Sequence, residues 1–338
     1  MNTRKEGIGG QDFNEKVPKR VNKRYLSIDV FKGLSIVLMV FVNSIQLFEK
    51  IPSWSKHAEL YGLTYLDLIF PFFIFMMGLN LTLAYHKHKR KDGRVQTYKH
   101  FIKRFIIFIL LGMMLSIGYD SDGIYLNWGV LQVLGACGLC LLFFIDLKWY
   151  IRIFPAVILI ILYMFIIRPS FTQIIYEGIE GGLLGTISWV NLILLSSIMA
   201  EGLLKDEVEK FILFGSIAFV VLGLILSFLI APLSRQLVTS SYIILTVGIS
   251  GLVFYLIYYI FEIWGENKSF GNQENILSIL GKNSFFLFII HLLLISIGYE
   301  IFPLDLPVVF VLLLAGLNIL IILVTGYLLY KADVIVKF

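Results

Sequence analysis

The stretch RYLSIDVFKGLSIVLMVFVNSIQLFEKIPSWSKHAELYGLTYLDLIFPFFIFMMGLNLTLAY, residues 24–85, decides the fold of this protein. It contains two long apolar segments that are separated by a short polar loop. About 20 consecutive apolar residues cross the hydrocarbon core of a bilayer as an α-helix, so each segment predicts one membrane span. Both segments also carry polar side chains where apolar ones are expected, and these need a separate explanation.

The whole chain shares the apolar character of this stretch. Its 338 residues are 58% hydrophobic, with a mean hydropathy of +0.86. A soluble protein cannot bury that much apolar surface, so the composition predicts an all-α polytopic membrane protein, a bundle of about ten transmembrane helices. The expected spans are residues 26–48, 64–85, 104–119, 127–146, 152–168, 187–204, 211–231, 241–263, 276–298 and 307–330.

The distribution of Lys and Arg predicts the orientation of the bundle. Of the 28 such residues, 22 fall in the N-terminal tail and on one set of connections, and 4 fall on the opposite set. Basic residues favour the cytoplasmic side, so we expect both termini to be cytoplasmic and His57 to be extracytoplasmic. We divide the chain into a basic cytoplasmic tail (1–24), which lacks the apolar core of a cleavable signal, and a transmembrane domain (25–338). A break between bundles is expected at 265–275.

Three polar residues mark the two ends of the first span. Asp29 and Lys32 are three residues apart and share one helix face at the cytoplasmic mouth. They form either an interfacial ion pair or a site for an anionic cofactor, with Lys32 as the phosphate contact. Asn43 follows Asp29 by about 21 Å along a helix, which places it at the opposite membrane face. There it is either a helix-end group or a hydrogen-bond donor in an active site.

The loop histidine and the start of the second span form another candidate group. His57 is either simply solvated or a general base, the commonest role of imidazole near neutral pH. Asp67 lies near the same membrane face, where its charge also favours the start of a helix. Pro71 has no N–H for the carbonyl of residue 67, so the helix kinks or opens there. A freed carbonyl beside a carboxylate suits a water-filled pocket.

Four further polar residues, Asn80, Gln132, Asn283 and His291, lie within or near the ends of the spans. Polar side chains inside a membrane are costly and tend to face a cavity or a partner. We therefore expect them to contribute to cofactor binding, although His291 equally suits a structural role.

Two other features have competing interpretations. The pair Cys137 and Cys140 cannot complete a tetrahedral zinc site alone, and close helix packing of small residues explains it better than metal or redox chemistry. No metal is expected. The outer loop near 169–188 contains Glu180 and four glycines, and it is either a re-entrant segment or a cap over a site.

The motifs RYLSIDVFKGLSIVLMVFVN (24–43) and GLTYLDLIFPFFIFMMG (62–78), with the histidine loop between them, resemble the heparan-α-glucosaminide N-acetyltransferase family of transmembrane acyltransferases. The blocks GVLQVLG (129–135) and LGKNSFFLFIIH (280–291) resemble the family more weakly. Lys32 stands where the family usually has Arg, so a bidentate phosphate contact would become a point charge.

The resemblance implies a function and a site. The donor is acetyl-CoA taken from the cytoplasmic side, and the acceptor is a sugar amine on the other side. His57 matches the catalytic histidine of the family, and Asn43 matches the asparagine beside it. We add Asp67, which would either orient His57 or stabilise its charged form. The residues expected to bind the cofactor are Asp29, Lys32, Asn80, Gln132, Asn283 and His291.

We therefore expect an acyltransferase that moves an acetyl or other acyl group from cytoplasmic acyl-CoA to an extracytoplasmic amino sugar or glycan. His57 would act as general base or nucleophile. The alternatives are a transporter or channel lined by the same polar residues, and an envelope scaffold or sensor. The expected setting is a multi-pass protein of a prokaryotic cytoplasmic (inner) membrane, with acyl-CoA, the acceptor and lipid as partners. Nucleic acid is not expected as a partner, and a homodimer is left open.

Overall fold

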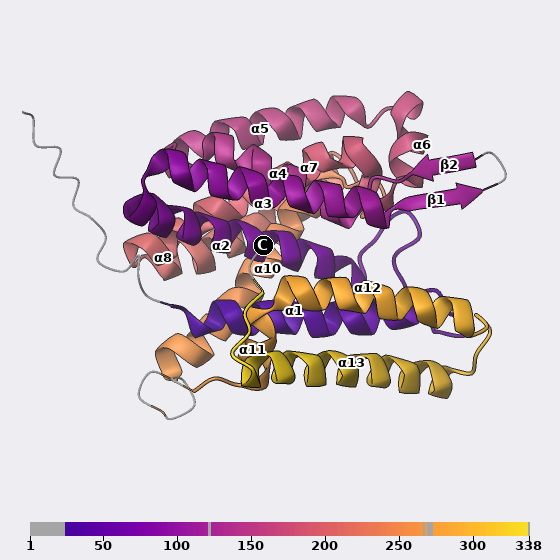
Figure 1. The fold of residues 1–338 in the computed structure, drawn as a ribbon. Helices are drawn as coiled ribbons and strands as arrows, with labels where there is room; N and C mark the ends of the chain where they lie inside the picture. Colours follow the sequence, from indigo (N-terminus) through magenta and orange to yellow (C-terminus); the bar gives the residue numbers. More distant parts are fainter. Residues whose placement is uncertain (1–23, 121–122, 266–267, 269–272, 337–338) are drawn as a thin grey trace, which may run out of the picture.

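The structure is a computed structural model that describes residues 24–336, with gaps at 121–122, 266–267 and 269–272. The expected basic tail, apart from Arg24, lies outside the described residues, as does most of the expected break at 265–275. The described chain is a bundle of long helices that run back and forth between two ends (Figure 1).

Each of the ten expected spans is mainly helical. The helices that correspond to them are α1 (Leu26–Ile45), α2 (Ile69–Asp92), α3 (Arg94–Leu115), α4 (Val130–Phe144), α5 (Trp149–Ile166), α7 (Gly182–Met199), α9 (Gly215–Leu229), α10 (Ser240–Tyr258), α12 (Ser284–Ile301) and α13 (Val308–Lys331). Shorter elements are α6 (Pro169–Glu177), α8 (Glu201–Lys205) and α11 (Ile276–Lys282). Eight helices of the described chain are long and apolar enough to cross a membrane. The prediction of an all-α polytopic membrane protein is confirmed.

The two remaining helices, α3 and α4, differ from the expected spans. The basic connection continues the helix, so α3 begins at Arg94 instead of residue 104, and its first half is charged. The segment 117–119 was expected to complete this span but instead opens a hairpin of β1 (Ile117–Asp120) and β2 (Gly123–Leu126). Glycine at 123 permits the backbone φ of +122° that the hairpin requires. α4 is short, with 15 residues.

Small residues bring α3 and α4 together. A Cβ atom at Gly135 would lie 2.8 Å from the Phe105 carbonyl oxygen, and one at Gly138 would enter the Phe105 ring. Cys137 is buried between these glycines, and both Cys137 and Cys140 are free thiols. The arrangement is the close helix packing that small residues permit.

The helices divide into a buried centre and an apolar periphery. α7 is buried along most of its length, whereas α5, α9 and α13 expose most of their apolar side chains and α12 is mostly half-buried. Phe228 on α9 is 86% exposed. An exposed apolar surface of this extent is stable only against lipid, which fits the hydropathy of these helices.

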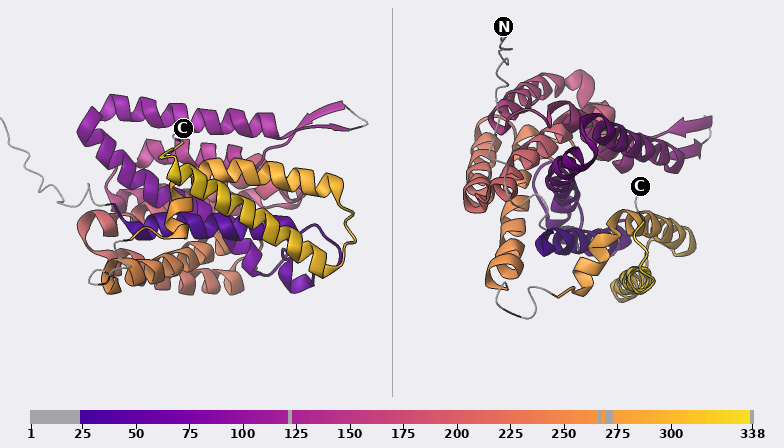
Figure 2. Two further views of the ribbon diagram at one scale, coloured as in Figure 1. Left: turned by 60° about the horizontal axis from the view of Figure 1, so that its bottom comes forward. Right: turned by 60° about the vertical axis from the view of Figure 1, so that its left-hand side comes forward.

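α1 joins two groups of helices. On one side it packs against α2 and α10, and on the other against α11, α12 and α13 (Figure 2). The basic end of the bundle comprises Arg24, the connections 92–94, 145–148 and 205–209, and Lys331. The His57 end comprises residues 46–64, 117–120, 123–126, 167–181, 230–239 and 302–307.

Glycines allow the backbones of α1 and α11 to touch. A Cβ atom at Gly33 would lie 1.9 Å from the Leu277 carbonyl oxygen, and one at Gly281 would lie 1.9 Å from the Asp29 carbonyl oxygen. Neither oxygen belongs to a flexible side chain, so neither can move aside cheaply. This contact holds the α11–α13 group in register with α1.

Replacement of Gly281 by Ala tests this contact. The added methyl group must push α11 from α1, and we expect a loss of about 1–3 kcal/mol in the free energy of unfolding. Thermal unfolding in detergent measures it. Gly316→Ala on α13 is the matched control, since a Cβ there meets nothing within 4 Å. Equal unfolding temperatures for the two variants would contradict the close-contact interpretation.

Candidate functional site

His57 and Asp67 form a hydrogen-bonded pair at the His57 end. Nδ1 of His57 lies 2.7 Å from Oδ1 of Asp67. An ionised carboxylate only accepts hydrogen bonds, so Nδ1 carries the proton and Nε2 keeps its lone pair. The Asp67 side chain is fully buried, whereas that of His57 is 23% exposed. An imidazole held in this tautomer can accept a proton or attack a carbonyl carbon at Nε2.

The second oxygen of the Asp67 carboxylate is held by the start of its own segment. Oδ2 accepts hydrogen bonds from the backbone N–H of Thr64 (2.8 Å) and from its hydroxyl (3.0 Å). The backbone N–H of Ala58, the neighbour of His57, lies 3.4 Å from the same oxygen. Asp67 thus caps a 3₁₀ turn at residues 65–68 and also anchors the histidine loop. Asp67 therefore lies at the start of a helical segment and also contacts the histidine loop, and the sequence had suggested both positions.

Pro71 frees the main-chain carbonyl of Asp67, as expected from the sequence. Instead of opening to a water-filled pocket, that carbonyl accepts a hydrogen bond of 2.6 Å from the hydroxyl of Tyr242 on α10. Tyr242 is fully buried, and its ring packs edge-on against Trp189. A residue far along the chain therefore supplies the donor that proline lacks.

Two charged residues that were not among the predicted site residues complete the group around Asp67. Nε of Arg235 lies 3.9 Å from Oδ1 of Asp67, the oxygen that His57 contacts. The Arg235 guanidinium also donates to Oε1 of Glu180. Burial lowers the pKa of Arg235, but Glu180 and the other neighbouring charges hold that pKa above its ordinary value. Arg235 could have been singled out from the sequence, because it is one of only four basic residues that were expected at the His57 end.

The Asn43 side chain forms hydrogen bonds with His291 and Gln46. The Asn43 amide nitrogen is 3.2 Å from Nε2 of His291, and the Asn43 amide oxygen accepts from Gln46 at 3.3 Å. Nδ1 of His291 donates to the Phe288 carbonyl, so Nε2 is the acceptor for Asn43. The structure thus pairs a residue expected to be catalytic with one expected to bind the cofactor.

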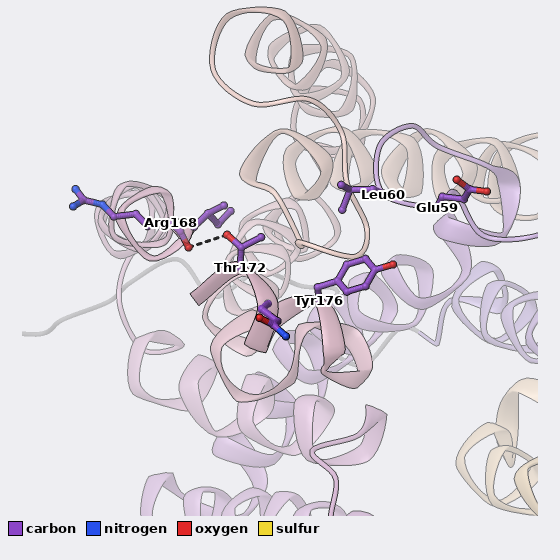
Figure 3. Close-up of a pocket in the computed structure, with 7 residues that line it drawn as sticks. Glu59, Leu60, Arg168, Thr172 and Tyr176 are labelled. Carbon is purple, nitrogen blue, oxygen red and sulfur yellow. Dashed lines mark hydrogen bonds between the residues drawn. The ribbon is translucent and has the colours of Figure 1, made fainter. Parts of the chain in front are cut away.

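A surface groove of about 700 Å³ lies beside the histidine loop. Glu59 and Leu60 form one wall, and Thr172, Gln173 and Tyr176 of α6 form the other. Tyr176 extends from α6 towards the loop (Figure 3). The outer loop expected as a cap thus contributes α6 to this groove and Glu180 to the Asp67 group.

A cavity of about 390 Å³ lies toward the basic end. It brings together three of the predicted cofactor residues, Lys32, Asn80 and Asn283. Nζ of Lys32 donates to the Asn80 amide oxygen at 3.2 Å and lies 3.7 Å from Asp29. The other polar residues that line the cavity were not among the predicted site residues; they are Ser35, His88, His100, Arg104, Lys282 and Ser284.

Arg104 differs from the other cations of this cavity. Lys282 forms an ion pair of 2.5 Å with Glu274. Hydrogen bonds from Lys282 and Arg24 lower the pKa of Glu274 to about 2. Nε of Arg104 is buried and has no hydrogen-bond partner among the described residues. Its guanidinium lies 5.5 Å from the Phe108 ring centroid. A buried guanidinium with free donors is a ready site for an anionic group such as phosphate.

Aromatic side chains separate this cavity from the Asn43–His291 pair. Phe73 lines the cavity, and its ring centroid lies 5.7 Å from that of Phe288. The Phe288 ring lies 5.0 Å from the His291 ring. A series of side-chain contacts therefore connects the cavity, through Phe73, Phe288 and His291, with Asn43.

Three of the predicted cofactor residues, Asp29, Gln132 and His291, lie outside the cavity lining. Asp29 pairs with Arg24 at 2.8 Å and with Lys32, which is the ion-pair interpretation of this motif. The Gln132 amide nitrogen donates to the Ser116 hydroxyl and the Asn127 carbonyl, and its amide oxygen accepts from the Gly129 N–H. These hydrogen bonds stabilise the start of α4. Asn283 lines the cavity, but its amide bonds the main chain at Val334 and Val336.

The motifs that build these sites match a known family. The family profile described as heparan-alpha-glucosaminide N-acetyltransferase, catalytic, matches residues 24–192, half of the chain. The chain belongs to this family. A mouse (Mus musculus) heparan-alpha-glucosaminide N-acetyltransferase is 38% identical over 74 residues, 22% of this chain and 11% of that protein. The human (Homo sapiens) protein of the same name is 44% identical over 62 residues, 18% of this chain and 9% of that protein.

The matched regions span about a tenth of the length of these two relatives. The family profile includes His57, Asp67 and Arg104. Arg235 and Tyr242 lie beyond it, although both contact Asp67. Membership of the family therefore accounts for the histidine loop but not for all the residues that hold it.

A double-mutant cycle between Pro71 and Tyr242 tests the support of the Asp67 carbonyl. Tyr242→Phe leaves a buried carbonyl without a donor and is expected to cost about 1–3 kcal/mol of unfolding free energy. In a Pro71→Ala background the restored N–H can reach that carbonyl, so the same change should cost less. Chemical or thermal unfolding in detergent measures both. Additive costs would show that the two residues do not share this carbonyl.

Proposed function

We propose that this protein is a membrane-embedded acyltransferase that transfers an acetyl or similar acyl group from acyl-CoA to an amine or hydroxyl of a sugar-type acceptor. The observation that carries the proposal is the His57–Asp67 pair, in which a buried carboxylate fixes the imidazole with Nε2 as the basic nitrogen. Membership of the acetyltransferase family supports the reaction class. The basic end faces the cytoplasm in this proposal, in keeping with the distribution of Lys and Arg.

The donor enters at the basic end. Its phosphates are drawn to the cavity that contains Arg104 and Lys32, the first of which has free donors. Lys32 and Asn43 are separated by about 17 Å along α1, so an extended pantetheine arm can cover the distance between the two ends. Phe73 lines the cavity and packs against Phe288, and in this proposal the two rings move aside for the arm to pass.

The chemistry takes place at the His57 end. Nε2 of His57 removes a proton from the acceptor amine or hydroxyl as its nitrogen or oxygen attacks the thioester carbonyl. The C–S bond breaks, and the CoA sulfur leaves and takes up a proton. A route in which Nε2 attacks first and forms an acyl-imidazole uses the same atoms. Asn43, held by His291, supplies an amide N–H to the oxyanion that develops on the carbonyl.

The acceptor approaches through the groove beside the histidine loop. Glu59 follows His57 by two residues, and the groove places this carboxylate opposite the exposed ring of Tyr176. A carboxylate and an aromatic ring suit an amine-bearing, hydroxylated molecule: one binds the ammonium and the other covers an apolar ring face.

Replacement of His57 by Ala tests the chemistry. We expect the rate of acyl transfer to fall about 10²–10⁴-fold, the usual contribution of a general base. Acyl-CoA binding should persist, because the donor cavity lies near the other end of the helices. Release of free thiol from acetyl-CoA, with glucosamine as acceptor, measures the rate. Lys56→Ala, in the same loop, is the control, and undiminished transfer in the His57 variant would rule out this role.

Replacement of Arg104 by Gln tests the donor cavity. Loss of a charge-assisted contact of about 1.5–3 kcal/mol should raise the Kd for CoA roughly 10–100-fold. Calorimetric titration of CoA into the detergent-solubilised protein measures it. Arg94→Gln is the matched control, because Arg94 is exposed and pairs with Asp146 outside the cavity. Equal Kd values for the two variants would place the phosphates elsewhere.

A further inference from the structure

A chain of four charged or titratable side chains ends at His57. His57 contacts Oδ1 of Asp67 at 2.7 Å, Arg235 lies 3.9 Å from the same oxygen, and Arg235 contacts Glu180. The members come from the histidine loop, the turn before α2, the segment before α7 and the loop before α10. The side chains of Asp67, Arg235 and Glu180 are 0%, 18% and 5% exposed, so solvent screens their interactions only weakly.

The fold orders this chain through specific main-chain contacts. Glu180 adopts a left-handed backbone conformation (φ 52°), which is costly for a residue other than glycine. Its carbonyl accepts a hydrogen bond of 2.9 Å from Trp189 Nε1. The loop that carries Arg235 is tied to the histidine loop by a 2.9 Å bond from the Gly62 N–H to the Leu233 carbonyl. The positions of both charges relative to His57 are therefore set by the backbone.

We infer that Arg235 and Glu180 are positioning residues that set the protonation state of His57. Arg235 and the imidazole both interact with the Asp67 carboxylate. Glu180 pairs with Arg235 and so weakens the interaction of Arg235 with Asp67. The inference rests on the role proposed for His57 as a base or nucleophile, because only the neutral imidazole can act in either way.

The charges of Arg235 and Glu180 act on the His57 imidazole in opposite directions. A carboxylate bound to imidazole alone favours the imidazolium, which cannot accept a proton. The positive charge of Arg235, 3.9 Å from Oδ1, opposes that effect. Without Glu180, Arg235 would act on Asp67 more strongly, and the neutral imidazole would persist to lower pH. Loss of Arg235 and loss of Glu180 must therefore act in opposite directions.

Other groups around His57 would change little in these variants. The charged and titratable side chains of the surrounding elements are Lys56, Glu59 and Tyr61 in the histidine loop, Tyr65 and Asp67 in the turn before α2, Arg168 and Tyr176 at and on α6, Glu180 before α7, Arg235 before α10, and Tyr242 on α10. Lys56 is bonded to the Glu49 carbonyl, and Glu59 is exposed. Among these described side chains, Asp67, Arg235 and Glu180 form the buried ion-pair chain that reaches His57.

The test follows the protonation of His57 directly. Diethylpyrocarbonate modifies neutral imidazole, and mass spectrometry of the His57 peptide reports its rate as a function of pH in the detergent-solubilised full chain. We expect the midpoint of this profile to rise by about one pH unit in Arg235→Gln and to fall by about half a unit in Glu180→Gln. Arg235→Lys, which keeps the charge, should return most of the shift. Lys50→Gln is the matched control, since Lys50 lies at the same end but pairs with Asp305.

The possible outcomes separate this inference from the proposed function. Opposite shifts in the two Gln variants support the inference, whether or not the wild type transfers an acyl group. If the wild type is an active transferase and the midpoints do not move, or move in the same direction, the inference is overturned while the function stands. If Arg235→Gln does not fold, Glu180→Gln decides the matter. A lower midpoint in that variant supports the inference, and an unchanged or higher midpoint overturns it.

Discussion

The buried carboxylate of Asp67 is the constraint on which the His57 end depends. A charge removed from water is tolerated only when donors surround it. Here those donors come from His57, from Thr64 and Ala58, and from the more distant Arg235. Tyr242 holds the main-chain carbonyl of the same residue. One residue thereby ties the histidine loop, the start of α2 and the entry to α10 together, and the imidazole gains a fixed tautomer from the same contacts.

The basic end is organised differently. There the cavity is lined by side chains from α1, α2, α3 and the α11–α12 junction, and the glycine contact between α1 and α11 holds that junction in place. Arg104 retains free donors, whereas Lys282 is neutralised by Glu274. The two ends therefore have complementary properties. One contains a buried guanidinium whose Nε has no partner among the described residues, and the other has its charges paired around the imidazole of His57. α1 and α2 contribute to both ends and set the distance between them.

Some residues that the sequence singles out lie together in the structure. Lys32, Asn80 and Asn283 line one cavity, and Asp67 is hydrogen-bonded to His57. The partner of Asn43 was not foreseen, because it lies 248 positions away on α12 and depends on how α12 is rotated against α1. Gln132 looked like an intramembrane polar residue but fastens the start of α4. A polar residue in an apolar segment signals that a partner exists, but not which one it is.

By itself the sequence determined the membrane class, the helical segments and the two-ended distribution of charge. These follow from local properties: hydropathy over about 20 residues and the positions of Lys and Arg. Only the tertiary structure decided which polar residues share a site. Glu180 and Arg235 are 55 positions apart, and each comes from a loop whose path is set by packing of the helices on either side. The strand pairing at 117–126 also needed both segments side by side. Contacts of this kind depend on helix rotation and loop path, which no local pattern of residues encodes.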